Sequence, residues 1–220
     1  MSALIYRTSL TACRFVDFQC IRRQVLHPER ADRAGPYVLA ATHLSHLEPV
    51  LVSLSVPRGV RWMSRIEFYK YRWSRWVLEA HGTFPVNRSG VPVSTIRRAV
   101  SLLDAGEVVG IFPEGGVVHG PAAAIRGGPI KGGACVIARR AGVPIVPVVV
   151  LGADKLNRLS PWLPARRGRV WMAFGQPLTS DPALPPRQAR HEMSGRLSAA
   201  MVSLYAELLA AFGLSDAQIP

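Results

Sequence analysis

The stretch YVLAATHLSHLEPVLVSLSV (37–56) joins a strand to a helix through a histidine. The run Tyr37–Thr42 predicts a buried strand, and Pro49–Val56 predicts a short helix. His43 follows the strand directly. Because open α/β sheets bind their ligands at the carboxyl ends of the strands, we expect a functional site around this histidine.

Outward from this stretch, strand patterns alternate with helical patterns. We expect strands at 61–64, 83–86, 108–112, 145–151 and 170–174, and helices at 67–80, 95–104, 132–140 and 187–212. This alternation predicts a single-domain α/β fold, with a largely parallel or mixed central sheet flanked by helices. Pro144 and Pro147 favour an edge position or an irregular start for the strand at 145–151.

The N-terminal segment reads as an amphipathic helix over residues 3–26, with a broad apolar set and interspersed arginines. Two interpretations stay open. The helix lies in a membrane interface with its arginines at the lipid headgroups, or it packs on the domain as a surface helix. We expect residues 1–30 to form this segment and residues 31–220 to form the main domain.

The composition is that of a globular protein whose surface attracts anions. Apolar residues make up 49 % of its 220 residues, which excludes a disordered chain. The net charge of +13 arises from 27 Lys and Arg against 14 Asp and Glu. Such a surface attracts nucleic acid, an anionic membrane leaflet or phosphate-bearing substrates, and charge alone does not choose among them.

The cysteines and the apolar runs of the sequence bear on the cellular compartment of the protein. The 3 cysteines form no CxxC motif and no Cys/His spacing for zinc, so we expect no metal and a reducing compartment. Arg7, Arg14 and Asp17 interrupt the apolar residues before a signal peptide can form. No run of about 18 apolar residues is free of charge, so we expect no transmembrane helix and a cytoplasmic protein.

His43 and Glu48 are the first candidates for chemistry. On a regular helix their spacing would place them about 140° apart, so they can meet only across a turn. Ser45 offers that turn as an N-cap, with Glu48 at the third helical position of a capping box. In one interpretation these two residues merely cap the helix. In the other, His43 is a general base whose tautomer Glu48 fixes, a role for which His46 has the wrong spacing.

Five further stretches follow in a fixed order: GTFPVNR (82–88), IFPEGG (111–116), IKGGA (130–134), VPIVPVVV (143–150) and FGQPL (174–178). Together with THLSHLEP (42–49) they span most of the chain. Their order and spacing resemble the glycerolipid acyltransferases, the family of 1-acylglycerol-3-phosphate acyltransferases. The family usually shows His-x4-Asp where this chain has Glu48. It usually continues Thr-Arg-Ser after FPEG, where this chain reads Gly116-Val117-Val118.

The resemblance implies an α/β acyltransferase that moves a fatty acyl group from acyl-CoA or acyl carrier protein to a hydroxyl of a lysophospholipid-type acceptor. We expect lysophosphatidic acid first. His43 would activate the hydroxyl and Glu48 would orient His43, without a covalent acyl-enzyme. The resemblance implies no cofactor and no metal. Residues implied or considered for contact with the acceptor or its phosphate are Arg88, Glu114, Gly115, Arg126 and Lys131.

The segment RWMSRIEFYKYRWSRW (61–76) interleaves arginines with aromatic residues. This pattern suits a membrane interface, single-stranded nucleic acid, or a partly buried helix with snorkelling arginines. We expect a peripheral protein on the inner face of the cell membrane, with an anionic membrane surface and no nucleic acid as partner. The alternatives are an aminolipid or glycolipid acceptor, or a non-catalytic basic domain that binds membranes or nucleic acid.

Overall fold

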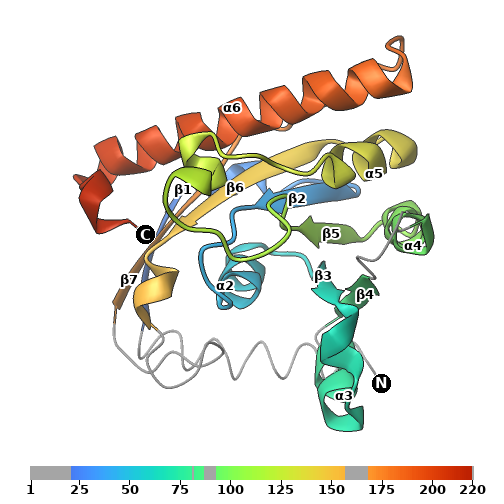
Figure 1. Ribbon diagram of the computed structural model, residues 1–220, viewed down its shortest axis with the longest axis horizontal. Coiled ribbons are helices and arrows are strands. Elements are labelled where there is room, and N and C mark those ends of the chain that lie inside the picture. Colours follow the sequence, from blue (N-terminus) through green and yellow to red (C-terminus); the bar gives the residue numbers. More distant parts are fainter. Residues whose placement is uncertain (1–20, 81, 87–92, 157–167, 220) are drawn as a thin grey trace.

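The computed structural model describes residues 21–80, 82–86, 93–156 and 168–219. This part of the chain forms a seven-stranded sheet with helices on both faces (Figure 1). The strands are β1 (Ile21–Leu26), β2 (Tyr37–Ala41), β3 (Val60–Arg65), β4 (Phe84–Val86), β5 (Val108–Ile111), β6 (Ile145–Leu151) and β7 (Gly168–Phe174). The α-helices are α2 (Glu48–Ser55), α3 (Arg72–Ala80), α4 (Val93–Asp104), α5 (Gly133–Ala141) and α6 (Pro186–Phe212).

The sheet is mixed and mostly parallel. Its strand order is β1-β7-β6-β2-β5-β3-β4, and each adjacent pair is parallel except β6 and β7. β2 and β6 are neighbours in the middle, and all of their residues are buried. Apolar strands of this kind are typical of sheets covered on both faces. The predicted α/β fold with a largely parallel or mixed central sheet is confirmed.

Two apolar layers hold the helices against the sheet. On one face α4, α5 and α6 pack over a layer that includes Val38 and Val149. On the other face α2 packs over a layer that includes Leu39 and Val148. Successive residues of one strand thus point to opposite faces, as strand geometry requires. The residues that α6 buries recur at helical spacing: Ala189, Met193, Leu197, Met201, Leu204, Tyr205 and Leu208.

The N-terminal expectation needs a correction. The helix expected over residues 3–26 is wrong for Ile21–Leu26, which form the edge strand β1 and pair in parallel with β7. Arg23 ties this strand to the end of α2, because its Nη1 donates to Ser55 Oγ at 2.9 Å. Residues 21–26 therefore belong to the central sheet. The remainder of the expected amphipathic helix falls on residues 1–20, outside the described residues.

Two other elements differ from expectation. The helix expected at 67–80 is divided into a 3₁₀ turn, η2 (Ile66–Tyr69), and α3. β6 is central, so the edge position is wrong, but its start is irregular. Pairing with β7 begins only at Val148, and the Pro147 carbonyl accepts instead from Gly175 N at 2.8 Å. A proline has no N–H to offer a neighbouring strand, which explains this break in the ladder.

The long helix α6 is by length and composition able to cross a membrane, with 28 % of its most apolar 18-residue window buried. Its buried side chains belong to the apolar layer described above, where α6 packs on β6 and β7. A helix with one apolar seam laid on a sheet is the usual cover of an α/β core. We therefore assign α6 to the core.

Candidate active site

The candidate site lies where the carboxyl ends of β2, β3 and β5 meet. β5 pairs with both β2 and β3 in parallel, so these three strands end at one edge of the sheet. His43 comes two residues after β2, and Phe112 comes directly after β5. The two connections touch, because Val118 N donates to the His43 carbonyl at 3.0 Å. The predicted place of His43 at a strand end is confirmed.

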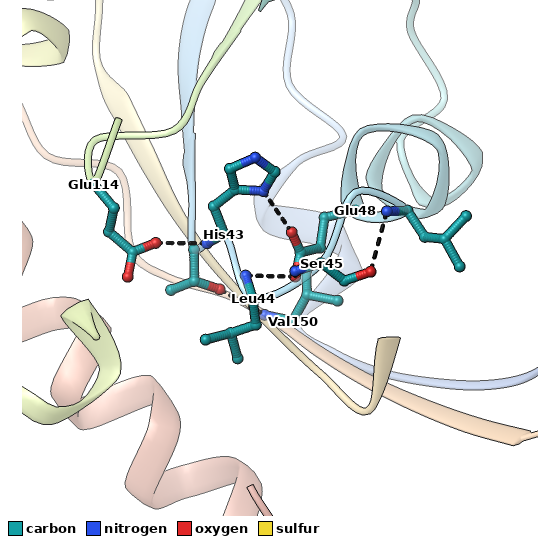
Figure 2. A network of polar contacts seen from close by, with 8 residues as sticks. His43, Leu44, Ser45, Glu48, Glu114 and Val150 are labelled. Carbon is teal, nitrogen blue, oxygen red and sulfur yellow. Dashed lines mark hydrogen bonds and ion pairs between the residues drawn. The ribbon is translucent and has the colours of Figure 1, made fainter. Parts of the chain in front are cut away.

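His43 and Glu48 form a close pair (Figure 2). The imidazole Nδ1 lies 2.8 Å from Glu48 Oε2, while Oε1 accepts from the backbone N–H groups of Leu44 and Ser45, each at 2.8 Å. Glu48 is fully buried, and the His43 side chain is 13 % exposed. A glutamate in place of the family's usual aspartate thus reaches the imidazole without difficulty.

The helix cap differs from the expected capping box. The N-cap residue of α2 is Leu47, which makes Glu48 the first helical residue and not the third. The Ser45 hydroxyl accepts from Leu47 N at 3.2 Å, one residue earlier than the box requires. Glu48 nevertheless accepts backbone hydrogen bonds from the turn before the helix. The predicted capping box is therefore wrong in register, but the Glu48 carboxylate still makes both kinds of contact: it accepts from the turn before the helix and it lies against the imidazole of His43.

The surroundings of Glu48 shift the pKa of its carboxyl group in opposite directions. Burial raises the pKa of Glu48 well above its usual value. Hydrogen bonds from Ser45 and Leu44 oppose this shift of the pKa, and the nearby Glu114 and Asp154 add to it. An ionised carboxylate can only accept, so Oε2 favours the His43 tautomer that carries a proton on Nδ1. Nε2 is then the nitrogen that carries the lone pair, which is the form that a general base needs.

An aromatic stack fixes the plane of the imidazole. The Phe112 ring stacks on His43 with centroids 4.0 Å apart, and the Trp62 ring stacks on Phe112 at 4.8 Å. Trp62 is itself held, because its indole Nε1 donates to Ser53 Oγ at 2.9 Å. The stack also needs a glycine at Gly110, where a Cβ would lie 2.4 Å from the indole ring. No sequence pattern predicts this stack, because its rings come from three separate segments.

The Glu114 carboxylate accepts hydrogen bonds from the backbone at two places. Its Oε2 accepts from His43 N at 2.6 Å (Figure 2), and its Oε1 accepts from Ala124 N at 2.8 Å. The residue is 8 % exposed, and burial raises the pKa of its carboxyl group while these two hydrogen bonds lower it. The resemblance implied contact with the acceptor. The contacts in the structure favour a positioning role, in which Glu114 sets the backbone that carries the base.

We expect Glu114→Gln to lower kcat and to leave the KM for the acceptor near that of the wild type. An amide has only one acceptor oxygen, so one of the two backbone N–H groups loses its partner, at a cost of about 1–3 kcal/mol. Steady-state kinetics with varied acceptor separate the two constants. A raised acceptor KM with unchanged kcat would instead assign Glu114 to acceptor binding.

Two cations flank the turn at Gly115 and Gly116. Gly115 has a φ of +80°, and a Cβ there would lie 2.5 Å from Lys131 Nζ. A Cβ on Gly116 would lie 3.3 Å from Arg65 Nη2. Lys131 is anchored beside the turn, since its N–H donates to the Pro113 carbonyl at 2.8 Å. An ammonium and a guanidinium thus lie against the turn that follows Glu114, a suitable place for an anion.

Arg65 is a site residue that no sequence motif indicates. It is the last residue of β3, and therefore lies at the same edge of the sheet as His43. It also lies close enough to His46 to help burial lower the pKa of that histidine. The available signal was its place at a strand end. Because the chain has 27 Lys and Arg, one arginine at a strand end does not stand out from the others.

The two remaining candidates are not brought to this turn by the described structure. Arg88 lies outside the described residues. The Arg126 guanidinium lies against the C-terminal segment, where Nη2 donates to Asp216 Oδ1 at 3.1 Å and to the Ile219 carbonyl at 3.2 Å. It also lies over the Tyr205 ring. Within the described part of the chain, no group of three or more His, Cys, Asp or Glu is placed to hold a metal ion.

A buried histidine–carboxylate pair at the carboxyl edge of a mixed sheet, with cations nearby, fits general-base transfer to a hydroxyl. The family model described as Acyltransferase matches residues 22–151, which is more than half of the chain and includes both members of the pair. The chain belongs to this acyltransferase family.

Individual relatives and one solved structure show which acyltransferases this chain resembles. A 1-acyl-sn-glycerol-3-phosphate acyltransferase of Bacillus subtilis is 27 % identical over 156 residues, which is 70 % of this chain and 73 % of the relative. An enzyme of the same name from Streptococcus pneumoniae is 29 % identical over 144 residues, covering 64 % of this chain and 50 % of the relative. The crystal structure of PlsC, the 1-acyl-sn-glycerophosphate acyltransferase of Thermotoga maritima, matches with a TM-score of 0.63 at 20 % identity. That match covers 92 % of this chain and 79 % of PlsC, and it supports the fold.

Proposed function

We propose that the protein transfers a fatty acyl group from acyl-CoA or acyl carrier protein to the free hydroxyl of 1-acyl-sn-glycerol-3-phosphate. The observation that carries the proposal is the His43–Glu48 pair, with Nδ1 and Oε2 2.8 Å apart at the end of β2. The names of the bacterial relatives support the choice of acceptor. We place the protein on the inner face of the cell membrane, where a lipid acceptor meets a cytoplasmic donor.

In the proposed reaction, Nε2 of His43 takes the proton of the acceptor hydroxyl as its oxygen attacks the thioester carbonyl carbon. The carbon–sulfur bond breaks, an ester forms, and the leaving sulfur takes the proton back from the imidazolium. Glu48 keeps the other proton on Nδ1 and stabilises the imidazolium between these steps. The one cysteine in the described residues, Cys135, is no rival nucleophile, because it is buried and burial raises its pKa.

The acceptor's phosphate is proposed to bind at the turn of Gly115 and Gly116, between Lys131 and Arg65. These two cations offer a substitute for the arginine that the family usually carries after FPEG. The direct test is an acceptor screen with acyl-CoA and acyl carrier protein as donors. We expect transfer to 1-acyl-sn-glycerol-3-phosphate to be much faster than transfer to lyso-aminolipids or glycolipids. Equal rates with phosphate-free acceptors would favour the alternative acceptors instead.

We expect Arg65→Ala and Lys131→Ala each to raise the acceptor KM by about tenfold or more, because a charge-assisted contact contributes about 1.5–3 kcal/mol. The donor KM should stay near that of the wild type. Arg126→Ala is the matched control: it also removes a cation, but one that pairs with Asp216. It should lower the melting temperature and spare the acceptor KM. If Arg126→Ala alone raised the acceptor KM, the phosphate would bind elsewhere than at this turn.

A further inference from the structure

The exposed apolar side chains are concentrated in one short segment. The described residues include six large apolar side chains with substantial exposure, and four of them fall within eleven residues. These four are Ile66 (45 % exposed), Phe68 (37 %), Tyr71 (58 %) and Trp76 (58 %). Scattered single apolar residues are normal on a protein surface, whereas a cluster of this kind marks an interaction site.

The structure divides the aromatic residues of this region into two sets. Trp62 is buried in the stack beneath His43, and Tyr69 is buried with its hydroxyl 2.6 Å from Thr83 Oγ1. These two serve the fold. Residues 65–76, which we call the arm, comprise η2 and the first turns of α3. In Figure 1, α3 projects away from the body of the protein, on the side opposite α6.

The arm is also basic. It carries Arg65, Lys70, Arg72 and Arg75 against one acid, Glu67, which gives four positive charges and one negative, a net charge of +3. All five of these side chains are exposed. Lys70 lies over the Tyr71 ring, with 5.8 Å from Nζ to the ring centroid. Aromatic rings interleaved with cations suit the headgroup region of a bilayer, where each ring has one apolar and one polar neighbour.

The arm begins at the candidate site. Its first residue, Arg65, has its guanidinium beside Gly116, and β3, which leads into the arm, contributes Trp62 to the stack under His43. Any binding partner whose surface contacts the arm therefore lies next to the proposed binding place of the acceptor's phosphate. The link between the arm and the acceptor's phosphate rests on the proposed function. The composition and exposure of the arm are independent of it.

We propose that the arm inserts its apolar side chains into the headgroup region of an anionic bilayer leaflet. Charge complementarity favours an anionic leaflet over a second copy of the same arm, because the net charge of +3 attracts the first and repels the second. The aliphatic Ile66 and the exposed Trp76 supply apolar area that a lipid surface can bury. Bound in this way, the protein takes a lipid acceptor from the leaflet on which it rests.

The test is sedimentation of the full-length protein with vesicles, without substrates. We expect binding to phosphatidylcholine vesicles that contain phosphatidylglycerol, little binding to phosphatidylcholine alone, and release by salt. Trp76→Ser should weaken binding by about tenfold. Removal of charge with Arg72→Gln or Arg75→Gln should weaken binding by about fivefold for each change.

Matched controls lie on the opposite side of the fold. Val202→Ser removes an apolar side chain of 38 % exposure from α6, and Arg140→Gln removes an exposed charge at the end of α5. Both should bind vesicles like the wild type. Transfer by Trp76→Ser should fall for an acceptor embedded in vesicles and stay normal for a short-chain acceptor in solution. Melting temperatures should be unchanged, because the altered side chains are exposed.

Three results would overturn the proposal. The first is that Trp76→Ser and Phe68→Ser proteins bind vesicles as tightly as Val202→Ser. The second is that the wild type binds single-stranded oligonucleotides and no vesicles. The third is that the arm mediates self-association, which the same two changes abolish. Because sedimentation needs no turnover, vesicle binding without transfer would count against the proposed function and leave the arm's role intact.

Discussion

A folded His43→Ala protein is expected to lose acyl transfer by about 10²–10⁴-fold, the usual contribution of a general base. Two groups hold the imidazole, Glu48 at Nδ1 and Phe112 against its face, and Glu114 holds the backbone N–H of the same residue. Such convergence on one residue fixes Nε2 in place for a proton transfer. Initial rates of ester formation, compared at equal concentrations of folded protein, measure the loss.

His46→Ala is the matched control for this experiment. Its ring lies edge-on to His43 with centroids 5.8 Å apart, so it shares the neighbourhood of the base. The described carboxylate contact of Glu48 is with His43, however, and we expect His46→Ala to retain most of the activity. Near-wild-type turnover by His43→Ala, or a complete loss in His46→Ala alone, would show that the wrong histidine has been chosen as the base.

Much of the sheet could be predicted because its central strands have distinctive local patterns. β2 and β6 are short runs of buried apolar residues bounded by polar or turn residues, and their length and boundaries favour a strand over a helix. The apolar run of β2 is therefore enough to place His43 at a strand end. The α/β alternation likewise follows from patterns within each element, which need no knowledge of distant partners.

β1 was mistaken for helix because its structure depends on a distant strand. The sequence IRRQVL (21–26) has only one buried residue, Ile21, and no clean alternation. What makes it a strand is pairing in parallel with β7, which begins at Gly168, 147 residues after Ile21 in the chain. Local propensity cannot register such a partner, and tertiary pairing overrides it.

The sequence predicts only those residues of the site that belong to recognisable motifs. His43, Glu48 and Lys131 could be named from their patterns, and the structure brings all three to one edge of the sheet. Arg65 and the stack of Trp62 on Phe112 could not, because they depend on β3 lying beside β5. Strand order is a property of the assembled sheet, and no local pattern encodes it.

Glu48→Gln is expected to abolish nearly all activity through the tautomer of His43. Two backbone N–H groups, of Leu44 and Ser45, donate to Oε1, so the amide oxygen of a glutamine must take that place. The amide NH₂ then occupies the position of Oε2 and donates to Nδ1. This drives the imidazole proton to Nε2, which loses the lone pair that a base requires. We expect a fall in kcat of about 10²–10⁴-fold.

The same substitution should not unfold the protein, which separates a chemical role from a structural one. Burial raises the folded-state pKa of Glu48 above its unfolded value of about 4.3. A carboxyl group shifted in this direction contributes stability below its unfolded pKa, and that contribution is lost as the pH rises through the folded pKa. At neutral pH a glutamine avoids this loss and keeps both backbone hydrogen bonds. The melting temperature of Glu48→Gln should therefore equal or exceed that of the wild type at pH 7 and vary less with pH. Full activity in this variant would reduce Glu48 to a helix cap, and a large drop in melting temperature would mean that its hydrogen bonds outweigh the cost of burying its charge.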